Sequence, residues 1–396
     1  MAKSIKFDKI QNHLNTTYNF KIYDCVASLP PDWNAVAEDN IFLKTDYLSA
    51  LETSKPHNMT CFFVGLFVLE KLEGIILSQF FDGSNMDSFG DRDRCLKTYV
   101  RNFVFKNFSS RVLFIGNAML TGQNAFVFSD NINTKTAKNT LDEVQKKLVQ
   151  KIDTLGKKVH LVSLKDFSQS DAVQFDTKTY KRYYQFSIQP NMIFYMDYDW
   201  KTEIDYVNAL SKKYRDQFKR ARKKCTDLEK RKLDLHEIID YEKTIYNLYF
   251  HVAKNAPFNT FYLAENHFSS LKKHLKDDFL FYGYFLDNKL LGFNTLIKNG
   301  TIMETYFLGY DETVQKDKML YLNMLYDMIA YSIKKGFKKI VFARTALEIK
   351  SSVGAKPEQL FGYLKHNNRI LNFLLKYVFN LVEPKVHWNE RNPFKL

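Results

Sequence analysis

The sequence predicts an α/β (α+β) protein of two similar halves, each with a mixed central sheet flanked by helices. Three observations lead to this prediction: a hairpin-like segment occurs twice, similar helices surround both copies, and a buried strand closes each half. The chain has 396 residues, of which 45% are hydrophobic and 26% charged. This length and composition suit a globular protein with two cores.

The repeated segment reads VGLFVLEKLEG at 64–74 and YGYFLDNKLLG at 282–292. Gly65 and Gly74 correspond to Gly283 and Gly292, 218 positions later in both cases. Each copy has an apolar run, a short polar turn and a second apolar run, which is typical of a β-hairpin. Each half is therefore expected to contain an antiparallel pair of strands.

Similar helical segments precede the hairpins at 42–52 and 262–273, and an amphipathic helix follows each hairpin before a glycine and a buried strand. The apolar positions of these later helices are Leu141, Val144, Leu148 and Ile152 in the first half, and Leu322, Leu325, Ile329 and Ile333 in the second. A helix between two strands of one sheet must cross over, so the last strand should run parallel to its neighbour. We place the boundary near Gln189 and Pro190, giving domains 1–190 and 191–396.

The first half carries an insertion at 82–110, read as a polar loop followed by a helix. Gly74 and Gly156 are 82 positions apart, whereas Gly292 and Gly336 are 44 apart. We expect the second half, with the shorter passage from hairpin to helix, to carry the chemistry.

A strongly basic helix is predicted from Tyr206 to Cys225, where apolar residues recur at steps of three and four. Between Lys212 and Lys224 stand eight basic residues and one acidic residue, Asp216. Neighbouring like charges repel unless an anion lies beside them. One reading is a solvated face; the other, which the missing acidic residues favour, is a site for a pyrophosphate, a tRNA backbone or an acidic carrier protein. The residues proposed to bind it are Lys212, Arg215, Lys219 and Arg222.

Two further groups of candidate residues belong to the second half, one within a strand and one after a strand. Period-two alternation places Glu304 and Tyr306 on one face of a strand, either for proton transfer in a cleft or simply for packing. Arg344, Glu348 and Lys350 follow the last buried strand, and ligands of open sheets bind beyond the carboxyl ends of strands. An ion pair between Arg344 and Glu348 that only fixes the loop is the alternative.

Several classes of function lack support in the sequence. There is no GxGxxG, P-loop, HExxH or nucleophile-elbow motif, and the cysteines and histidines show no metal-ligand spacing. No apolar run is long enough to span a membrane, and residues 1–14 have no signal-peptide core. We therefore expect a cytoplasmic protein without a metal. Its formal charge of +14 favours anionic partners.

Taken together, these segments resemble the GNAT acyltransferase superfamily, and more closely its tandem members, the Fem-type peptidoglycan aminoacyltransferases and related predicted bacterial N-acyltransferases. The resemblance rests on the basic helix SKKYRDQFKRARKK, the hairpin YGYFLDNKLLGF, the strand and helix ETYFLGY…MLYLNMLYDMIAYSIKKGFKKIVFAR, and TALEIKSSVGAKPEQL. It spans most of residues 30–370. It implies two GNAT domains in tandem and transfer of an acyl group to an amine.

The resemblance also implies roles for residues. A lysine in a K-x-x-x-G segment lies near the reacting carbonyl in Fem-type enzymes, and Lys350 with Gly354 matches this segment. Lys350 would stabilise an oxyanion, Glu304 or Tyr306 would handle a proton, and Arg344, Glu348, Asn323 and the basic helix would hold substrate.

The sequence departs from the family at two points. The junction at 311–319 lacks the glycines that bind the CoA pyrophosphate in ordinary GNAT enzymes, and its acidic residues are expected to face the acceptor or another part of the chain. The helical hairpin that Fem-type enzymes insert for tRNA is not evident.

The predicted function is an N-acyltransferase that uses acyl-CoA, an acyl carrier protein or aminoacyl-tRNA as co-substrate, with no tightly bound cofactor. The acceptor would be a small-molecule or lipid-linked amine in the groove between domains, and peripheral membrane contact is compatible with this. The alternative is a non-catalytic GNAT-like protein that binds tRNA, an anionic glycolipid or a cell-wall precursor.

Overall fold

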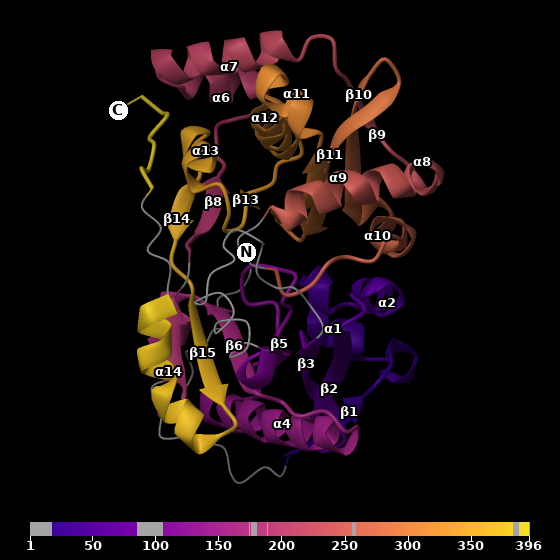
Figure 1. The fold of residues 1–396 in the computed structure, drawn as a ribbon, viewed down its shortest axis with the longest axis vertical. Coiled ribbons are helices and arrows are strands. Elements are labelled where there is room, and N and C mark those ends of the chain that lie inside the picture. Colours follow the sequence, from indigo (N-terminus) through magenta and orange to yellow (C-terminus); the bar gives the residue numbers. More distant parts are fainter. Residues whose placement is uncertain are drawn as a thin grey trace.

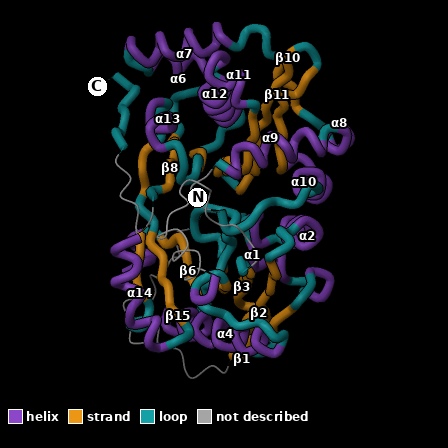
Figure 2. Tube along the Cα trace, viewed as in Figure 1, coloured by secondary structure: helices purple, strands orange, loops and turns teal. Residues whose placement is uncertain are grey.

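The computed structural model describes residues 18–84, 106–173, 175, 180–187, 189–255, 259–382 and 388–395. Its described residues form two sheets, which lie in the lower and upper parts of the molecule in Figure 1. The insertion predicted at 82–110 lies largely outside the described residues. Figure 2 shows helices around both sheets, as the sequence predicts.

The first sheet has eight strands in the order β1-β2-β3-β4-β6-β15-β7, with β5 paired to β3. Its strands are β1 (Tyr18–Tyr23), β2 (Met59–Val68), β3 (Lys71–Asp82), β4 (Arg111–Ile115), β5 (Phe126–Phe128), β6 (Leu161–Phe167), β7 (Tyr184–Ser187) and β15 (Phe361–His366). β4 and β6 run parallel and the other pairs are antiparallel.

The second sheet has seven strands in the order β14-β8-β13-β12-β11-β10-β9. They are β8 (Asn191–Tyr195), β9 (Glu229–Lys232), β10 (Phe279–Leu286), β11 (Lys289–Asn299), β12 (Ile302–Tyr310), β13 (Lys339–Val341) and β14 (Lys356–Glu358). Among the described residues of this sheet, only β12 and β13 pair in parallel. Both sheets are therefore mixed, with the parallel pair formed across a helix.

The helices of the first half are α1 (Trp33–Ala37), α2 (Thr45–Ser54), α4 (Thr134–Thr154) and α5 (Gln169–Val173). Those that follow are α6 (Glu203–Ala209), α7 (Lys212–Lys224), α8 (Leu235–Asp240), α9 (Glu242–Lys254), α10 (His267–Leu275), α11 (Glu312–Lys318), α12 (Leu320–Lys334), α13 (Leu347–Ser352) and α14 (Arg369–Val382). The crossover helices are α4 and α12, and all eight apolar positions predicted for them are buried. No helix among the described residues is long and apolar enough to cross a membrane.

The two hairpins agree in detail. Their turns use left-handed backbone at Leu69 and Glu70 (φ 49° and 67°) and at Asp287 and Asn288 (φ 48° and 61°). Such two-residue turns match the twist of the strands that they join. The pairing register shifts after Leu66 in one hairpin and after Tyr284 in the other, again 218 positions apart. The repeat predicted from the sequence is thus visible in the backbone.

The chain leaves the first sheet at β7 and enters the second at β8, which is where we placed the domain boundary. One strand departs from this division, because β15 returns to the first sheet and pairs with β6 and β7. The division at residue 190 stays a prediction, and residues 361–366 complete the first sheet.

A shared core joins the halves. Buried residues of α2 and of α10 belong to one apolar cluster, which includes Leu48, Leu51, Phe268 and Leu271. The two helices lie side by side in Figure 1. Their polar contacts include the Thr53 and Ser270 hydroxyls, 2.7 Å apart. Because corresponding helices pack on each other, the halves form one continuous unit.

Candidate active site

The basic segment forms two helices and not the single helix predicted from Tyr206 to Cys225. Helix α6 ends at Ala209, Leu210 is extended (φ −65°, ψ 142°), and α7 begins after Ser211. The C-terminal segment accounts for the break, since Leu210 bridges Phe394 and the Ser211 N–H donates to the Pro393 carbonyl. The period of apolar residues predicted the buried face but did not reveal this interruption.

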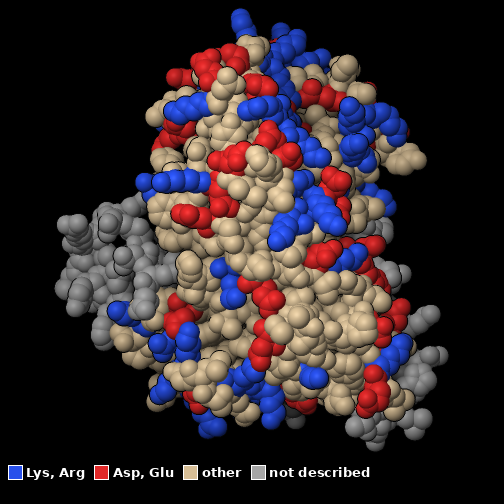
Figure 3. Space-filling view, turned by 90° about the vertical axis from the view of Figure 1, so that its right-hand side faces the viewer, with Lys and Arg blue, Asp and Glu red and all other residues tan. Residues whose placement is uncertain are grey.

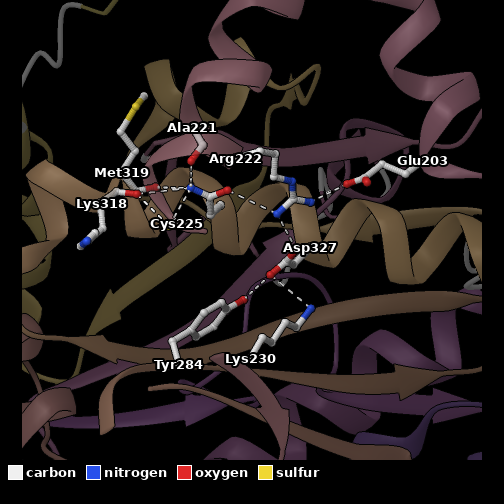
Figure 4. A network of polar contacts seen from close by, with 10 residues as sticks. Glu203, Ala221, Arg222, Cys225, Lys230, Tyr284, Lys318, Met319 and Asp327 are labelled. Carbon is white, nitrogen blue, oxygen red and sulfur yellow. Dashed lines mark hydrogen bonds and ion pairs between the residues drawn. The ribbon is translucent and has the colours of Figure 1, made fainter. Parts of the chain in front are cut away.

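Arg222 lies in a polar network that joins α7 to neighbouring elements of the second half (Figure 4). Its guanidinium donates to Asp327 at 2.7 Å and also pairs with Glu203. Asp327 accepts two more bonds, from Lys230 at 3.2 Å and from the Tyr284 hydroxyl at 2.8 Å. These carboxylates raise the pKa of Arg222 against the opposing effect of its burial. The network fixes α7 against α6, α12 and β9.

Asn323 belongs to the same network. Its amide nitrogen donates to the Ala221 carbonyl at 2.9 Å, and its oxygen accepts from Arg222 at 3.3 Å. Both groups that were assigned to substrate, Arg222 and Asn323, therefore bind each other and the neighbouring helix. The assignment stays a prediction, and a substrate would have to replace or extend these contacts.

The other basic residues of α7 differ from Arg222. Lys212 and Lys219 are exposed and Arg215 is half-buried, and none of the three forms an ion pair within 4.0 Å in the part of the chain that the structure describes. The upper half of Figure 3 shows basic side chains interspersed with acidic ones. These three side chains are available to an anionic ligand.

Helices α6 and α7 contact the segment that carries Lys350. Gln217 on α7 lies 3.5 Å from the Ser352 hydroxyl of α13. The Tyr206 hydroxyl on α6 donates to the Val353 carbonyl at 3.0 Å. Two segments predicted to act on the same substrate are thus neighbours in the fold.

Strands β12 and β13 diverge at this site. They pair in parallel only from Ile302 to Glu304 and from Lys339 to Val341. Beyond this point β12 continues to Tyr310 beside β11, with a bulge where Thr305 and Leu308 face Leu296 and Asn294. The next residues after β13 instead hydrogen-bond to β8. An opening between two parallel strands leaves backbone groups free to meet a ligand.

Lys350 points at this divergence from α13. Its side chain is buried, with the residue 4% exposed, and its amine donates to the carbonyls of Phe342 and, at 3.4 Å, Ala343. No carboxylate pairs with it among the described residues. Burial lowers its pKa to about 7. A buried amine without an anionic partner is costly, so it marks a functional candidate.

Glu304 is the last residue of β12 that pairs with β13, opposite Val341, and the partners of its carboxyl are Asn299 and Lys339. It is 7% exposed. Burial raises its pKa to about 7, although a hydrogen bond from Asn299 and the charge of Lys339 act in the opposite direction. A carboxyl group with this pKa can exchange a proton near neutral pH.

Tyr306 lies two residues further on, within the bulge, and takes part in a buried chain between the halves. Its hydroxyl is 2.9 Å from His267 Nε2 and is hydrogen-bonded to Tyr47. The Asn117 amide donates to Tyr47 at 2.9 Å. Asn117 and Tyr47 come from the first half, Tyr306 and His267 from the second.

The contacts of His267 show which group donates in its hydrogen bond with Tyr306. His267 Nδ1 lies 3.1 Å from both the carbonyl and the hydroxyl of Ser54, and this hydroxyl already donates to Ala50. Nδ1 must therefore carry the proton, and Nε2 accepts from Tyr306. Burial lowers the pKa of His267 to about 4, in agreement with a neutral ring. To donate to a substrate, Tyr306 would have to give up its bond to His267.

Arg344 and Glu348 do not pair with each other, so the ion pair considered as an alternative is wrong. Arg344 pairs with Asp166, a buried residue of the first half that also pairs with Lys165 at 2.9 Å. Glu348 accepts from the Asn389 N–H at 3.0 Å and pairs with Arg391 at 3.4 Å. Long-range partners replaced the local one because the loop faces both the first half and the C-terminal segment.

The junction after β12 folds into the short helix α11 and not into an open loop. Asp311 caps this helix by accepting from the Thr313 N–H at 2.9 Å, and Glu312 lies 2.9 Å from His251. Glu312 therefore faces another part of the chain, whereas Asp311 holds the start of its own helix. Met319, in left-handed conformation (φ 49°), leads directly into α12.

Sequence reasoning missed His267, Tyr47, Asn117 and Asp327 as members of these polar groups. His267, like Tyr47, stands among apolar residues of its helix, and this position was a usable signal of burial. The other two gave no such signal. The described residues contain no group of three or more potential metal ligands.

Two cavities of about 310 and 340 Å³ lie elsewhere. One is beside α5 and β15, and the other is beside His251 and Glu312. Neither includes a residue predicted for the site.

Comparison with solved structures gives the fold class. The crystal structure of FemX matches with a TM-score of 0.51 and 12% identity, over 89% of this chain and 98% of that chain. A tandem GNAT protein from the clavulanic acid biosynthesis pathway matches with a TM-score of 0.50 and 8% identity, over 88% and 99% of the two chains. Searches against protein-family models and curated proteins give no match.

The chain thus has the tandem-GNAT fold, as predicted. In this fold each mixed sheet with its crossover helix is one GNAT unit, and β12 and β13 are the parallel pair of the second unit.

Proposed function

We propose that the protein is an N-acyltransferase that moves an acyl or aminoacyl group from an activated donor to an amine. The proposal rests on the tandem-GNAT fold and on one observation within it. At the point where β12 and β13 separate, the buried Glu304 is the last residue of β12 that pairs with β13, and the buried amine of Lys350 donates to the carbonyl of Phe342, the residue that follows β13. Both have a pKa of about 7, one raised and one lowered by burial.

The reaction requires these two kinds of group. The amine nitrogen of the acceptor attacks the carbonyl carbon of the donor, the bond from that carbon to the sulfur or oxygen of the donor breaks, and the amine loses a proton. A protonated Lys350 would stabilise the negative oxygen that forms during attack. Glu304 would accept the proton.

The donor would be held by side chains and not by a glycine-rich loop. Helix α11 occupies the junction where such a loop would present N–H groups. Lys212, Arg215 and Lys219 on α7 are free of ion pairs in the described structure, so they are the proposed anchors for phosphates. This arrangement suits the pyrophosphate of an acyl-CoA, the prosthetic group of a carrier protein or the backbone of a tRNA.

A second candidate is a binding protein without turnover. It is favoured by the observation that Lys350, Tyr306 and Arg222 are already hydrogen-bonded within the fold. In that case α7 would retain an anionic ligand, and no bond would be made or broken.

A screen of donors against amines, followed by mass spectrometry, separates the two. An enzyme gives a product heavier than the amine by the acyl group and releases the free thiol or tRNA. Lys350→Met should lower kcat by at least about tenfold if it removes oxyanion stabilisation. Lys335→Met, an exposed lysine after α12, is the matched control. Absence of product with every donor class, together with salt-dependent retention of tRNA or CoA, would favour the binding protein.

A further inference from the structure

Helix α14 presents a stripe of large apolar side chains to solvent. Ile370, Phe373, Leu374 and Tyr377 are 73%, 72%, 40% and 59% exposed. Their spacing of three, four and seven residues places them on one face of the helix. Elsewhere in the described structure, exposed large apolar residues do not recur at helical spacing on any helix.

The stripe is not a sign of a loosely attached helix. On the opposite side Leu375 is buried against Leu161 and Leu364 of the first sheet. Asn372 fixes the orientation, because its nitrogen donates to the Arg182 carbonyl at 3.0 Å and its oxygen accepts from the His366 N–H at 2.8 Å. The fold therefore holds one apolar face inward and a second one outward.

The surroundings of the stripe are basic. Arg369 and Lys376, exposed and seven positions apart, lie together on the flank beside Phe373. Lys181 and Arg182 come from the segment that contacts Asn372. The sequences of α14, β15 and residues 180–187 contain no Asp or Glu. The described structure shows no ion pair for these four basic residues.

An apolar face bordered by Lys and Arg fits the interface of an anionic bilayer, where apolar groups enter the acyl boundary and the cations meet lipid phosphates. A second copy of the chain fits less well. Four side chains on one helix cover far less than the roughly 1,000 Å² that a stable protein interface needs, and two basic flanks would repel each other. The outer position of α14 on the lower half leaves it accessible (Figure 1).

We propose that α14 docks the protein on anionic membrane surfaces through Ile370, Phe373, Leu374 and Tyr377, with Arg369 and Lys376 at the lipid phosphates. The helix lies on the surface and does not cross it. This inference does not rest on the proposed function, because it concerns the first sheet and can be measured without catalysis.

The test is co-sedimentation of the full chain with vesicles of phosphatidylcholine and phosphatidylglycerol (3:2) and with vesicles of phosphatidylcholine alone. The protein should sediment with the anionic vesicles, and less so as salt rises. Phe373→Ser/Tyr377→Ser should reduce partitioning by at least about tenfold, since each buried aromatic side chain is worth more than that factor. Arg369→Gln/Lys376→Gln should weaken binding to anionic vesicles only.

The matched control is Tyr198→Ser/Ile204→Ser, which removes two exposed apolar residues that are 89% and 68% exposed elsewhere. It should bind vesicles like the parent. Ile370→Ser, a single exposed change, gives a second variant if the double one does not fold, as judged from its melting temperature. Wild-type protein that stays in the supernatant with anionic vesicles would overturn the proposal. So would a concentration-dependent dimer that Phe373→Ser/Tyr377→Ser abolishes.

Discussion

Replacing Lys350 by methionine is expected to remove a pH dependence from the stability of the protein. Burial lowers the pKa of this amine from 10.5 to about 7 in the folded chain. Between these values the unfolded chain binds a proton that the folded chain does not, so stability rises with pH by about 1.4 kcal/mol per unit. The loss of folding free energy caused by burying Lys350 is present in full below pH 7 and disappears as the pH approaches 10.5. From pH 7 to 9 the gain is about 2 to 3 kcal/mol.

Methionine has a similar length and no charge, so it should fill the same space. It leaves the carbonyls of Phe342 and Ala343 without this donor, which costs about 1 to 3 kcal/mol at every pH. Urea denaturation of both proteins at pH 7, 8 and 9 gives the difference in free energy of unfolding. The free energy of unfolding of the wild type should increase relative to that of the variant as the pH rises. A constant difference within about 0.5 kcal/mol would show that Lys350 keeps an ordinary pKa, and the reasoning from burial would be wrong.

Three further substitutions test other polar groups. Arg222→Gln should lower the free energy of unfolding by about 2 kcal/mol, because Glu203 loses its cation and Asp327 keeps only Lys230 and the Tyr284 hydroxyl. Exposed Arg220→Gln should change it by less than about 0.5 kcal/mol in urea denaturation; equal effects would show that the contacts of Arg222 contribute nothing to stability. Tyr306→Phe should lower the free energy of unfolding by about 1 to 3 kcal/mol, and exposed Tyr198→Phe should hardly change it. A melting curve of Tyr306→Phe equal to that of the wild type would contradict the buried hydrogen bond from Tyr306 to His267. Burial raises the pKa of Glu304 from the ordinary 4.5 to about 7 in the folded chain, so the free energy of unfolding of the wild type should fall by up to about 3 kcal/mol as the pH rises from 4.5 to 7. That of Glu304→Gln should not show this fall. If the stability of the wild type and of Glu304→Gln changed with pH in the same way, the raised pKa of Glu304 would be refuted.

The repeated hairpins were predictable because their signals are local. A tight turn needs residues that accept left-handed backbone, and the glycines stand where Cβ atoms would collide: a Cβ on Gly65 would lie 2.9 Å from Leu72, and one on Gly283 would lie 3.0 Å from Leu290. The two hairpins therefore share both the spacing of their residues along the chain and the close contact between glycine and leucine. Crossover helices were predictable for a similar reason, since their apolar period records which face meets the sheet.

Contacts between distant segments were not predictable in this way. The break at Leu210 depends on residues 393–395, and the partner of Arg344 is Asp166 on another sheet. Nothing in the sequence near these residues records such partners. The same limit applies to β15, whose alternating pattern identifies a strand but not the sheet that it joins.

For the candidate site, the sequence indicated the segments better than the roles. It placed Lys350 beyond a strand end and Glu304 on one face of a strand; in the structure the Lys350 amine donates to the Phe342 carbonyl just after β13, and Glu304 is the last residue of β12 that pairs with β13, while their roles stay predictions. It also indicated a basic helix. It did not reveal that Arg222 would be held by carboxylates from α6 and α12, because charge compensation here comes from elements 19 and 105 positions away.

The first half supports the predicted site of the second half in three ways. Asp166 holds Arg344 beside the divergence of the strands, Tyr47 and Asn117 orient the phenol of Tyr306, and β6 receives the strand that follows the Lys350 segment. Each contact crosses between halves and fixes a residue near the proposed site. The first half thus supports three segments of the second that contain or adjoin predicted site residues. The return of β15 to the first sheet adds to this support, because the two halves cannot separate unless the strand between β6 and β7 is removed.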